Sequence, residues 1–92
     1  MSGAAASRVA VVTGAGSATG IGFAVARVLG RTGMRVVIAS TTDRIHERAA
    51  DLHRAGIEAT AVACNLTSEA GVAALVAATG AGETVDVLVN NA

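Results

Sequence analysis

The sequence of 92 residues contains no Lys, Tyr, Trp or Pro, and it has one Phe and one Cys. Without Lys there is no phosphate-binding lysine of the Walker type, no Schiff base and no lysine general base. Without Tyr there is no phenol that could act as an acid or a base. Cys64 alone forms neither an internal disulfide nor a cysteine-based metal site, which favours a reducing, cytoplasmic location.

Charge is also scarce, because seven Arg balance seven acidic residues and charged residues make up 15% of the chain. A neutral chain with one aromatic residue lacks the basic stripe and stacking rings of a nucleic-acid surface, so no nucleic-acid partner is expected. The apolar runs are far shorter than the roughly 18 residues of a membrane span. Residues 1–7 predict a disordered tail, and residues 8–92 a partial dinucleotide-binding domain.

Apolar runs and helix-like segments alternate along the chain. The run of β-branched residues at Val9–Val12 is typical of a strand buried on both faces. Further strands are expected at 35–39, 57–64 and 85–89, and helices at 21–32, from Thr42 or Asp43 to 55, and from Thr67 or Ser68 to 79. This order predicts an α/β fold, a Rossmann-like doubly wound parallel sheet with strand order 3-2-1-4 that stops after its fourth strand.

Apolar spacing predicts which face of each helix is buried. The predicted faces are Ile21, Val25, Val28 and Leu29 in the first helix, Ile45, Ala49 and Leu52 in the second, and Val72, Leu75, Val76 and Thr79 in the third. We expect the first two helices on one side of the sheet and the third on the other.

The segment from Gly14 to Gly22 is rich in glycine, follows a strand and opens a helix. That context is typical of a dinucleotide-binding loop, because glycines let the backbone approach a pyrophosphate and the helix N-terminus attracts its charge. Ser17 and Thr19 could add hydroxyl donors. A tight turn without a ligand and a methyltransferase-type glycine loop are the alternatives.

Two motifs stand out: Thr13-Gly14 with Gly20-Ile21-Gly22, and Asn90-Asn91-Ala92 after the fourth strand. Together they resemble the short-chain dehydrogenase/reductase family, most closely its 3-oxoacyl carrier-protein reductases. The resemblance covers residues 8–92 and implies an NAD(P)-dependent oxidoreductase that moves hydride between a nicotinamide and a carbonyl or alcohol carbon. The implied cofactor-binding residues are Gly14, Gly16, Ser17, Gly20, Ile21, Gly22, Ser40, Thr41, Arg44, Asn65, Leu66, Asn91 and Ala92.

The sequence departs from the family pattern in two informative places. Its glycine loop is two residues longer than usual, so either Gly14 or Gly16 could begin the stretch that meets the pyrophosphate. Asn65 stands where the family usually has an Asp that contacts adenine.

The end of the second expected strand bears on the choice of cofactor. It carries Ser40 and Thr41 where NAD-binding relatives usually have an acid, and Arg44 could pair with a 2′-phosphate. By resemblance this favours NADP over NAD, although Thr19 is not the basic residue of many NADP-binding relatives.

No residue of this sequence is assigned a catalytic role, because the family's Tyr and Lys are both missing, and no metal site is expected. We therefore expect the N-terminal dinucleotide-binding segment of an oxidoreductase that is inactive alone; a stand-alone, non-catalytic nucleotide-binding or assembly module is the alternative. The fourth strand, Val85–Val89, would be an apolar edge through which the chain self-associates or aggregates. The parent protein is expected to be a homo-oligomer with no membrane contact.

Overall fold

A computed structural model describes residues 8–80 and 84–91. Its elements are β2 (Val9–Thr13), α1 (Ile21–Arg31), β3 (Arg35–Ser40), α2 (Arg44–Arg54), β4 (Ala59–Ala63), α3 (Glu69–Thr79) and β5 (Val87–Val89). The predicted alternation of strands and helices is therefore confirmed. The expected tail at 1–7 and the site residue Ala92 lie outside the described residues.

The four strands form one parallel sheet in the order β4-β3-β2-β5, which is the predicted order 3-2-1-4. Val11 pairs with Val37 on one side and with Leu88 on the other, so β2 lies in the middle of the sheet. The order reverses between β2 and β5, because the chain moves outward twice and then returns to the other side of β2. In such sheets ligands bind beside this point, at the carboxyl ends of the strands.

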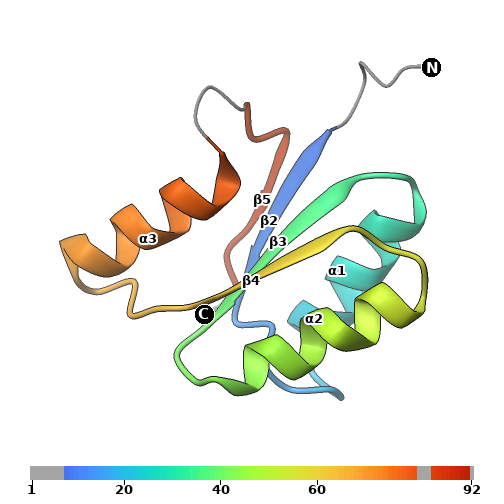
Figure 1. The fold of residues 1–92 in the computed structure, drawn as a ribbon, viewed down its shortest axis with the longest axis horizontal. Helices are drawn as coiled ribbons and strands as arrows, with labels where there is room; N and C mark the ends of the chain where they lie inside the picture. The colour runs from blue at the N-terminus through green and yellow to red at the C-terminus, as the bar shows by residue number, and fades with distance from the viewer. Residues whose placement is uncertain (1–7, 81–83, 92) are drawn as a thin grey trace.

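The sheet is covered on both faces, with α1 and α2 on one side and α3 on the other (Figure 1). This is the predicted division of the helices. One core lies beneath α1 and α2 and includes Val12, Ile38 and Leu52. A smaller core lies beneath α3, where Leu75 and Ala78 pack against the strands.

The buried face of α1 differs in part from the prediction, because Leu29 packs against the larger core as expected but two other predicted residues do not. Ile21 and Val28 are 74% and 59% exposed, whereas Gly22, Phe23, Ala26 and Gly30 are buried. A residue without a large side chain lets the helix backbone approach the sheet, and three of the four buried residues are Gly or Ala. Close approach, not apolar side-chain size, therefore sets the orientation of α1.

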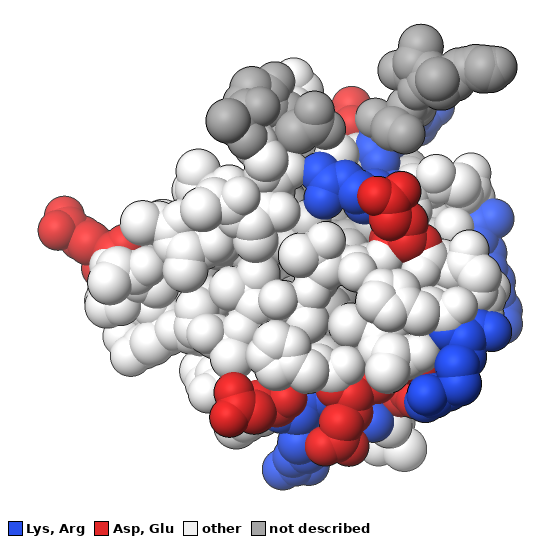
Figure 2. Space-filling model, in the orientation of Figure 1, with Lys and Arg blue, Asp and Glu red and all other residues white. Residues whose placement is uncertain are grey.

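The buried face of α3 agrees with the prediction at Leu75 and Thr79 but not at the two valines. Val72 and Val76 are 45% and 65% exposed, while Gly71 and Thr79 are buried. Of the two predicted caps for this helix, the structure uses Ser68, whose hydroxyl accepts a hydrogen bond from the Gly71 N–H at 3.0 Å. Figure 2 shows a broad surface without charged side chains over this part of the molecule.

The last strand is shorter than predicted and begins at Val87. Asp86 interrupts the regular pairing because its side-chain Oδ2 accepts a hydrogen bond from the Val9 N–H at 2.9 Å. The Asp86 N–H in turn donates to the Val9 carbonyl at 2.9 Å. The expected third strand is likewise shorter, and no helix within residues 8–80 and 84–91 has the length and apolar character needed to cross a membrane.

Candidate functional site

A cavity of about 460 Å³ opens at the carboxyl ends of β2, β3 and β4. Its size lies within the range of small-molecule and cofactor sites. The lining residues are Thr13, Gly14, Gly16, Ser17, Ala39, Ser40, Thr41, Thr42, Arg44, Cys64, Asn65, Leu66, Thr67 and Asn91. This lining contains one cationic side chain and no carboxylate, so the described part of the cavity wall suits an anion.

The glycine loop turns sharply at Gly14, whose φ of +66° is a left-handed conformation that glycine adopts without strain. The next residue, Ala15, is fully buried and donates its N–H to the Ala39 carbonyl at 3.1 Å. At the other end of the loop, Gly22 packs so closely that an added Cβ would lie 2.6 Å from the Gly14 carbonyl oxygen. The loop is therefore fixed against both β3 and the first turn of α1.

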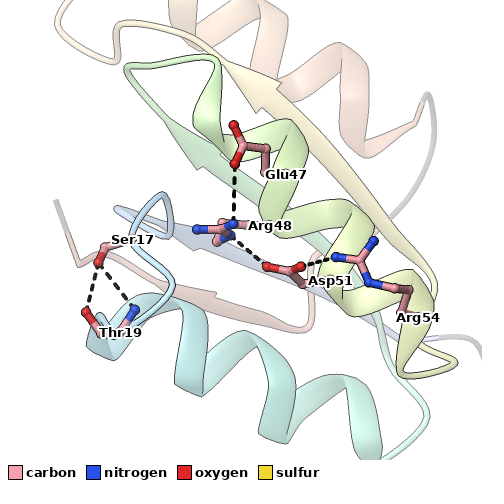
Figure 3. Close-up of polar contacts among 6 residues, drawn as sticks. All are labelled: Ser17, Thr19, Glu47, Arg48, Asp51 and Arg54. Atoms are coloured by element: carbon pink, nitrogen blue, oxygen red, sulfur yellow. Dashed lines mark hydrogen bonds and ion pairs between the residues drawn. The ribbon is translucent and has the colours of Figure 1, made fainter.

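The middle of the loop forms a turn at Ser17–Gly20, whose first three residues are exposed (Figure 3). The Ser17 Oγ accepts a hydrogen bond from the Thr19 N–H at 3.3 Å and lies 3.3 Å from the Thr19 Oγ1. The Gly20 N–H closes the turn by donating to the Ser17 carbonyl at 3.1 Å. The turn is thus held by contacts among its own residues, while Gly22 packs on Gly14.

The start of α1 offers backbone donors without competing groups. The N-cap residue is Gly20, so no side chain caps the helix, and its first turn contains no acid. The first backbone bond across this turn runs from the Ala24 N–H to the Gly20 carbonyl at 3.2 Å. In contrast, the first turns of α2 and α3 contain Glu47 and Glu69. Free N–H groups and the positive end of the helix dipole make α1 the best placed of the described helices to meet an anion.

The end of β3 forms the second wall of the cavity. The Ser40 Oγ accepts a hydrogen bond from the Thr42 N–H at 3.2 Å, and a Cβ added to Gly16 would lie 2.7 Å from that same Oγ. Gly16 therefore allows the loop to lie against Ser40. The nearest acid in sequence, Asp43, is the N-cap residue of α2 and does not line the cavity, whereas the exposed Arg44 does.

The end of β4 forms the third wall, where Asn65 and Leu66 follow the strand. The Asn65 Oδ1 accepts hydrogen bonds from the Thr67 N–H at 2.9 Å and from the Thr67 Oγ1 at 2.6 Å. Cys64 is half-buried and forms part of the cavity lining.

The residues after β5 connect that strand to the glycine loop. The Thr13 Oγ1 accepts a hydrogen bond from the Asn91 N–H at 3.0 Å and donates to the Asn90 Oδ1 at 3.1 Å. The Asn91 Nδ2 donates to the Gly14 carbonyl at 3.2 Å. Asn91 therefore lines the cavity and also holds the turn at Gly14 in place.

A second group of polar contacts lies on α2, away from the cavity lining (Figure 3). Arg48 Nε lies 2.9 Å from Asp51 Oδ2, and Arg54 pairs with the other oxygen of the same carboxylate. The Arg48 guanidinium also lies 5.8 Å from the centre of the Phe23 ring. The ion pairs lie within α2, and the ring contact joins α2 to α1. No group of three or more potential metal-ligating side chains occurs in the part of the chain that the structure describes.

Nine of the thirteen predicted site residues line this one cavity: Gly14, Gly16, Ser17, Ser40, Thr41, Arg44, Asn65, Leu66 and Asn91. Gly20, Ile21 and Gly22 lie at the start of α1 outside the lining, and Ala92 is outside the described residues. The sequence prediction missed Thr13, Ala39, Thr42, Cys64 and Thr67. All five lie at or just after the end of a strand, so this position would have been the signal that identified them.

The family model of short chain dehydrogenases matches residues 8–92. The chain is 46% identical over 88 residues to a Streptomyces coelicolor protein named as a ketoacyl reductase. This match covers 94% of this chain and 33% of that protein. It is 47% identical over 94 residues to the cis-4-hydroxycyclohexanecarboxylate dehydrogenase of Sinomonas cyclohexanicum. That match covers 100% of this chain and 36% of the relative. The chain thus spans about a third of the length of these curated relatives.

A solved structure of a related enzyme has the same fold over this part of its chain. The L-sorbose reductase of Gluconobacter frateurii, solved in complex with NADPH and L-sorbose, superposes with a TM-score of 0.82 at 36% identity. The match covers 94% of this chain and 33% of that enzyme.

Proposed function

This chain belongs to the short-chain dehydrogenase family, and we propose that it is the NADP-binding segment of an oxidoreductase that acts on a carbonyl or alcohol group. The observation that carries the proposal is the cavity at the ends of β2, β3 and β4, whose described lining has Arg44 and no carboxylate. A dinucleotide phosphate is strongly anionic, and such a wall attracts it without opposing repulsion.

The proposed cofactor would extend along the carboxyl edge of the sheet. Gly14, Gly16 and Ser17, with the start of α1 at Gly20–Gly22, would meet the pyrophosphate. Ser40, Thr41 and Arg44 would hold the ribose and its 2′-phosphate. Asn65 and Leu66 would contact the base, and Asn91 and Ala92 would lie toward the nicotinamide half, because β5 is on the opposite side of β2 from β3.

The choice of NADP rests on the end of β3. An acid at this position holds the ribose hydroxyls of NAD and repels a 2′-phosphate. Here the strand ends in Ser40 and is followed by two threonines, and Asp43 does not line the cavity. Hydroxyl donors and an exposed guanidinium are the groups that bind a phosphate. The relative solved with NADPH supports the same choice.

When bound, the cofactor would supply the hydride chemistry, while the residues of this chain would bind and orient it. The chain contains no Tyr and no Lys, so none of its residues is assigned a proton-transfer role. We therefore propose that the 92 residues hold the cofactor and do not by themselves turn over a substrate.

Ligand-detected saturation-transfer NMR on the 92-residue chain tests this function, because it detects weak binding and tolerates self-associated protein. We expect binding of NADP about tenfold tighter than that of NAD, since a single charge-assisted contact is worth about 1.5 kcal/mol. Arg44→Ala should weaken NADP binding about tenfold and leave NAD binding unchanged. Arg31→Ala is the matched control, because Arg31 is exposed at the far end of α1.

Each result has a clear reading. Binding of neither dinucleotide would refute the proposed function. Preference for NAD, or an equal effect of Arg31→Ala and Arg44→Ala on NADP, would refute the assignment of the 2′-phosphate to the end of β3.

A further inference from the structure

We propose that Asn65 makes the base end of the cavity a hydrogen-bond donor, so that this subsite accepts a 6-oxopurine at least as well as adenine. The inference rests on the proposed function, because it concerns the base of a dinucleotide bound in the same cavity. It identifies Asn65 as a residue that determines base specificity.

The order of the strands places Asn65 at the base end. The glycine loop follows β2, the ribose-binding position follows β3, and Asn65 follows β4, the next strand outward. A dinucleotide whose pyrophosphate lies on the glycine loop therefore passes Ser40 with its ribose and reaches the end of β4 with its base. Asn65 and the apolar Leu66 line the cavity there.

The hydrogen bonds of Asn65 determine which end of its amide is available. A backbone N–H only donates, so the atom that faces the Thr67 N–H at 2.9 Å must be the amide oxygen. The Thr67 hydroxyl lies 2.6 Å from that same oxygen. Rotating the amide by 180° would bring two donors together. The Asn65 Nδ2 is therefore the end left for a ligand, and it makes no hydrogen bond within residues 8–80 and 84–91.

The backbone around Asn65 is held in place as well. Its carbonyl oxygen accepts hydrogen bonds from the Ser68 N–H at 3.2 Å and from the Ser68 Oγ at 3.0 Å. Gly71 in the first turn of α3 packs so closely on this carbonyl that an added Cβ would overlap it. The turn is thus fixed to α3, and the two contacts from Thr67 fix the orientation of the amide on this turn.

The 6-substituent of a purine is the group that Asn65 can discriminate. In adenine it is an amino group, which donates, and opposite the Asn65 Nδ2 it would place donor against donor. In hypoxanthine it is a carbonyl oxygen, which accepts a hydrogen bond from that amide. A carboxylate at position 65 would keep one oxygen for Thr67 and offer the other to the amino group of adenine. The amide at position 65 thus reverses the polarity that a carboxylate would give.

The test compares NADP with nicotinamide hypoxanthine dinucleotide phosphate on the 92-residue chain, by the same saturation-transfer measurement. The two ligands differ only in the base, so the ratio of their dissociation constants isolates the base subsite. We expect the hypoxanthine dinucleotide to bind as tightly as NADP or more tightly. Asn65→Asp should shift the ratio about tenfold toward adenine, the effect of one hydrogen bond.

Asn90→Asp is the matched control, because it adds the same charge at a residue that does not line the cavity. It should change the binding of both dinucleotides equally. Tighter binding of NADP than of the hypoxanthine dinucleotide by the unaltered chain, or equal effects of Asn65→Asp and Asn90→Asp on the ratio, would overturn this inference alone. Binding of neither dinucleotide would overturn the proposed function and this inference with it.

Discussion

Gly22 offers a sharp test of how the chain shapes its glycine loop. In the structure an alanine Cβ at this position would lie 2.6 Å from the Gly14 carbonyl oxygen and 2.8 Å from the Asn91 Nδ2. Ordinary contact begins at 3.4 Å, so the loop would have to move by about 0.8 Å. Gly14 cannot simply yield, because it holds a left-handed turn and accepts the hydrogen bond from Asn91. Gly22→Ala should therefore distort the cavity wall.

The expected magnitude combines two opposing terms. Overpacking of this kind costs about 1–3 kcal/mol. Replacing glycine by alanine within a helix returns about 1 kcal/mol. The free energy of unfolding should thus fall by roughly 0–2 kcal/mol. The affinity for NADP should fall at least about tenfold, because the displaced loop is the proposed pyrophosphate site.

Gly30→Ala is the control for this prediction. Gly30 lies in the same helix, and an added Cβ would overlap the side chain of Ile57, but neither residue lines the cavity. Stability is best followed by far-UV circular dichroism in urea, since the chain has no Trp or Tyr to report by fluorescence. If Gly22→Ala binds NADP as the unaltered chain does, or if Gly30→Ala loses binding equally, the reasoning about the loop is wrong.

Three further variants test other parts of the fold. Asp86→Ala should lower the free energy of unfolding by about 1–3 kcal/mol in the same urea titration, because it leaves the N–H of the buried Val9 without its acceptor. Asp86→Asn keeps an acceptor and should lose less stability, and equal losses in the two variants would contradict this reason. Ser68→Ala should lower the free energy of unfolding by about 1 kcal/mol, because it removes the N-cap of α3, and Ser68→Thr should retain most of that stability. An unchanged stability in Ser68→Ala would exclude the cap as a stabilising contact. Leu88 is 66% exposed on β5, at the edge of the described sheet. Leu88→Lys should therefore raise the concentration at which the chain self-associates about tenfold in sedimentation velocity, whereas Val28→Lys on α1 should not. A chain that is monomeric without either change would refute self-association through β5.

The arrangement of strands and helices was predictable from the sequence because strand-like and helix-like patterns alternate without ambiguity. The buried face of α2 was predicted as well, since Ile45, Ala49 and Leu52 stand out among charged neighbours. The faces of α1 and α3 were predicted only in part, because both helices carry apolar residues on most sides. Their orientation follows from small residues such as Gly22 and Gly71, which allow close backbone contacts that only the folded chain reveals.

The sequence pattern also predicted where the site residues lie, but not how their side chains are oriented by contacts in the folded chain. The residues that line the cavity follow strand ends, which the alternation of elements had located. The orientation of the Asn65 amide depends on Thr67, and the attachment of Gly14 depends on Asn91, which lies 77 residues away in sequence. Sequence spacing gives no access to such contacts, because they depend on how the carboxyl ends of the strands come together.

Hydrogen–deuterium exchange with mass spectrometry is the best test of dinucleotide binding in this cavity, because it reports where a ligand protects the backbone whether or not the chain self-associates. We expect NADP to slow exchange in the segments around 14–22, 40–44 and 64–67, which form the walls of one cavity and the start of α1. Unchanged exchange in all three segments, or protection confined to the opposite end of the sheet around Thr32–Met34, would contradict it.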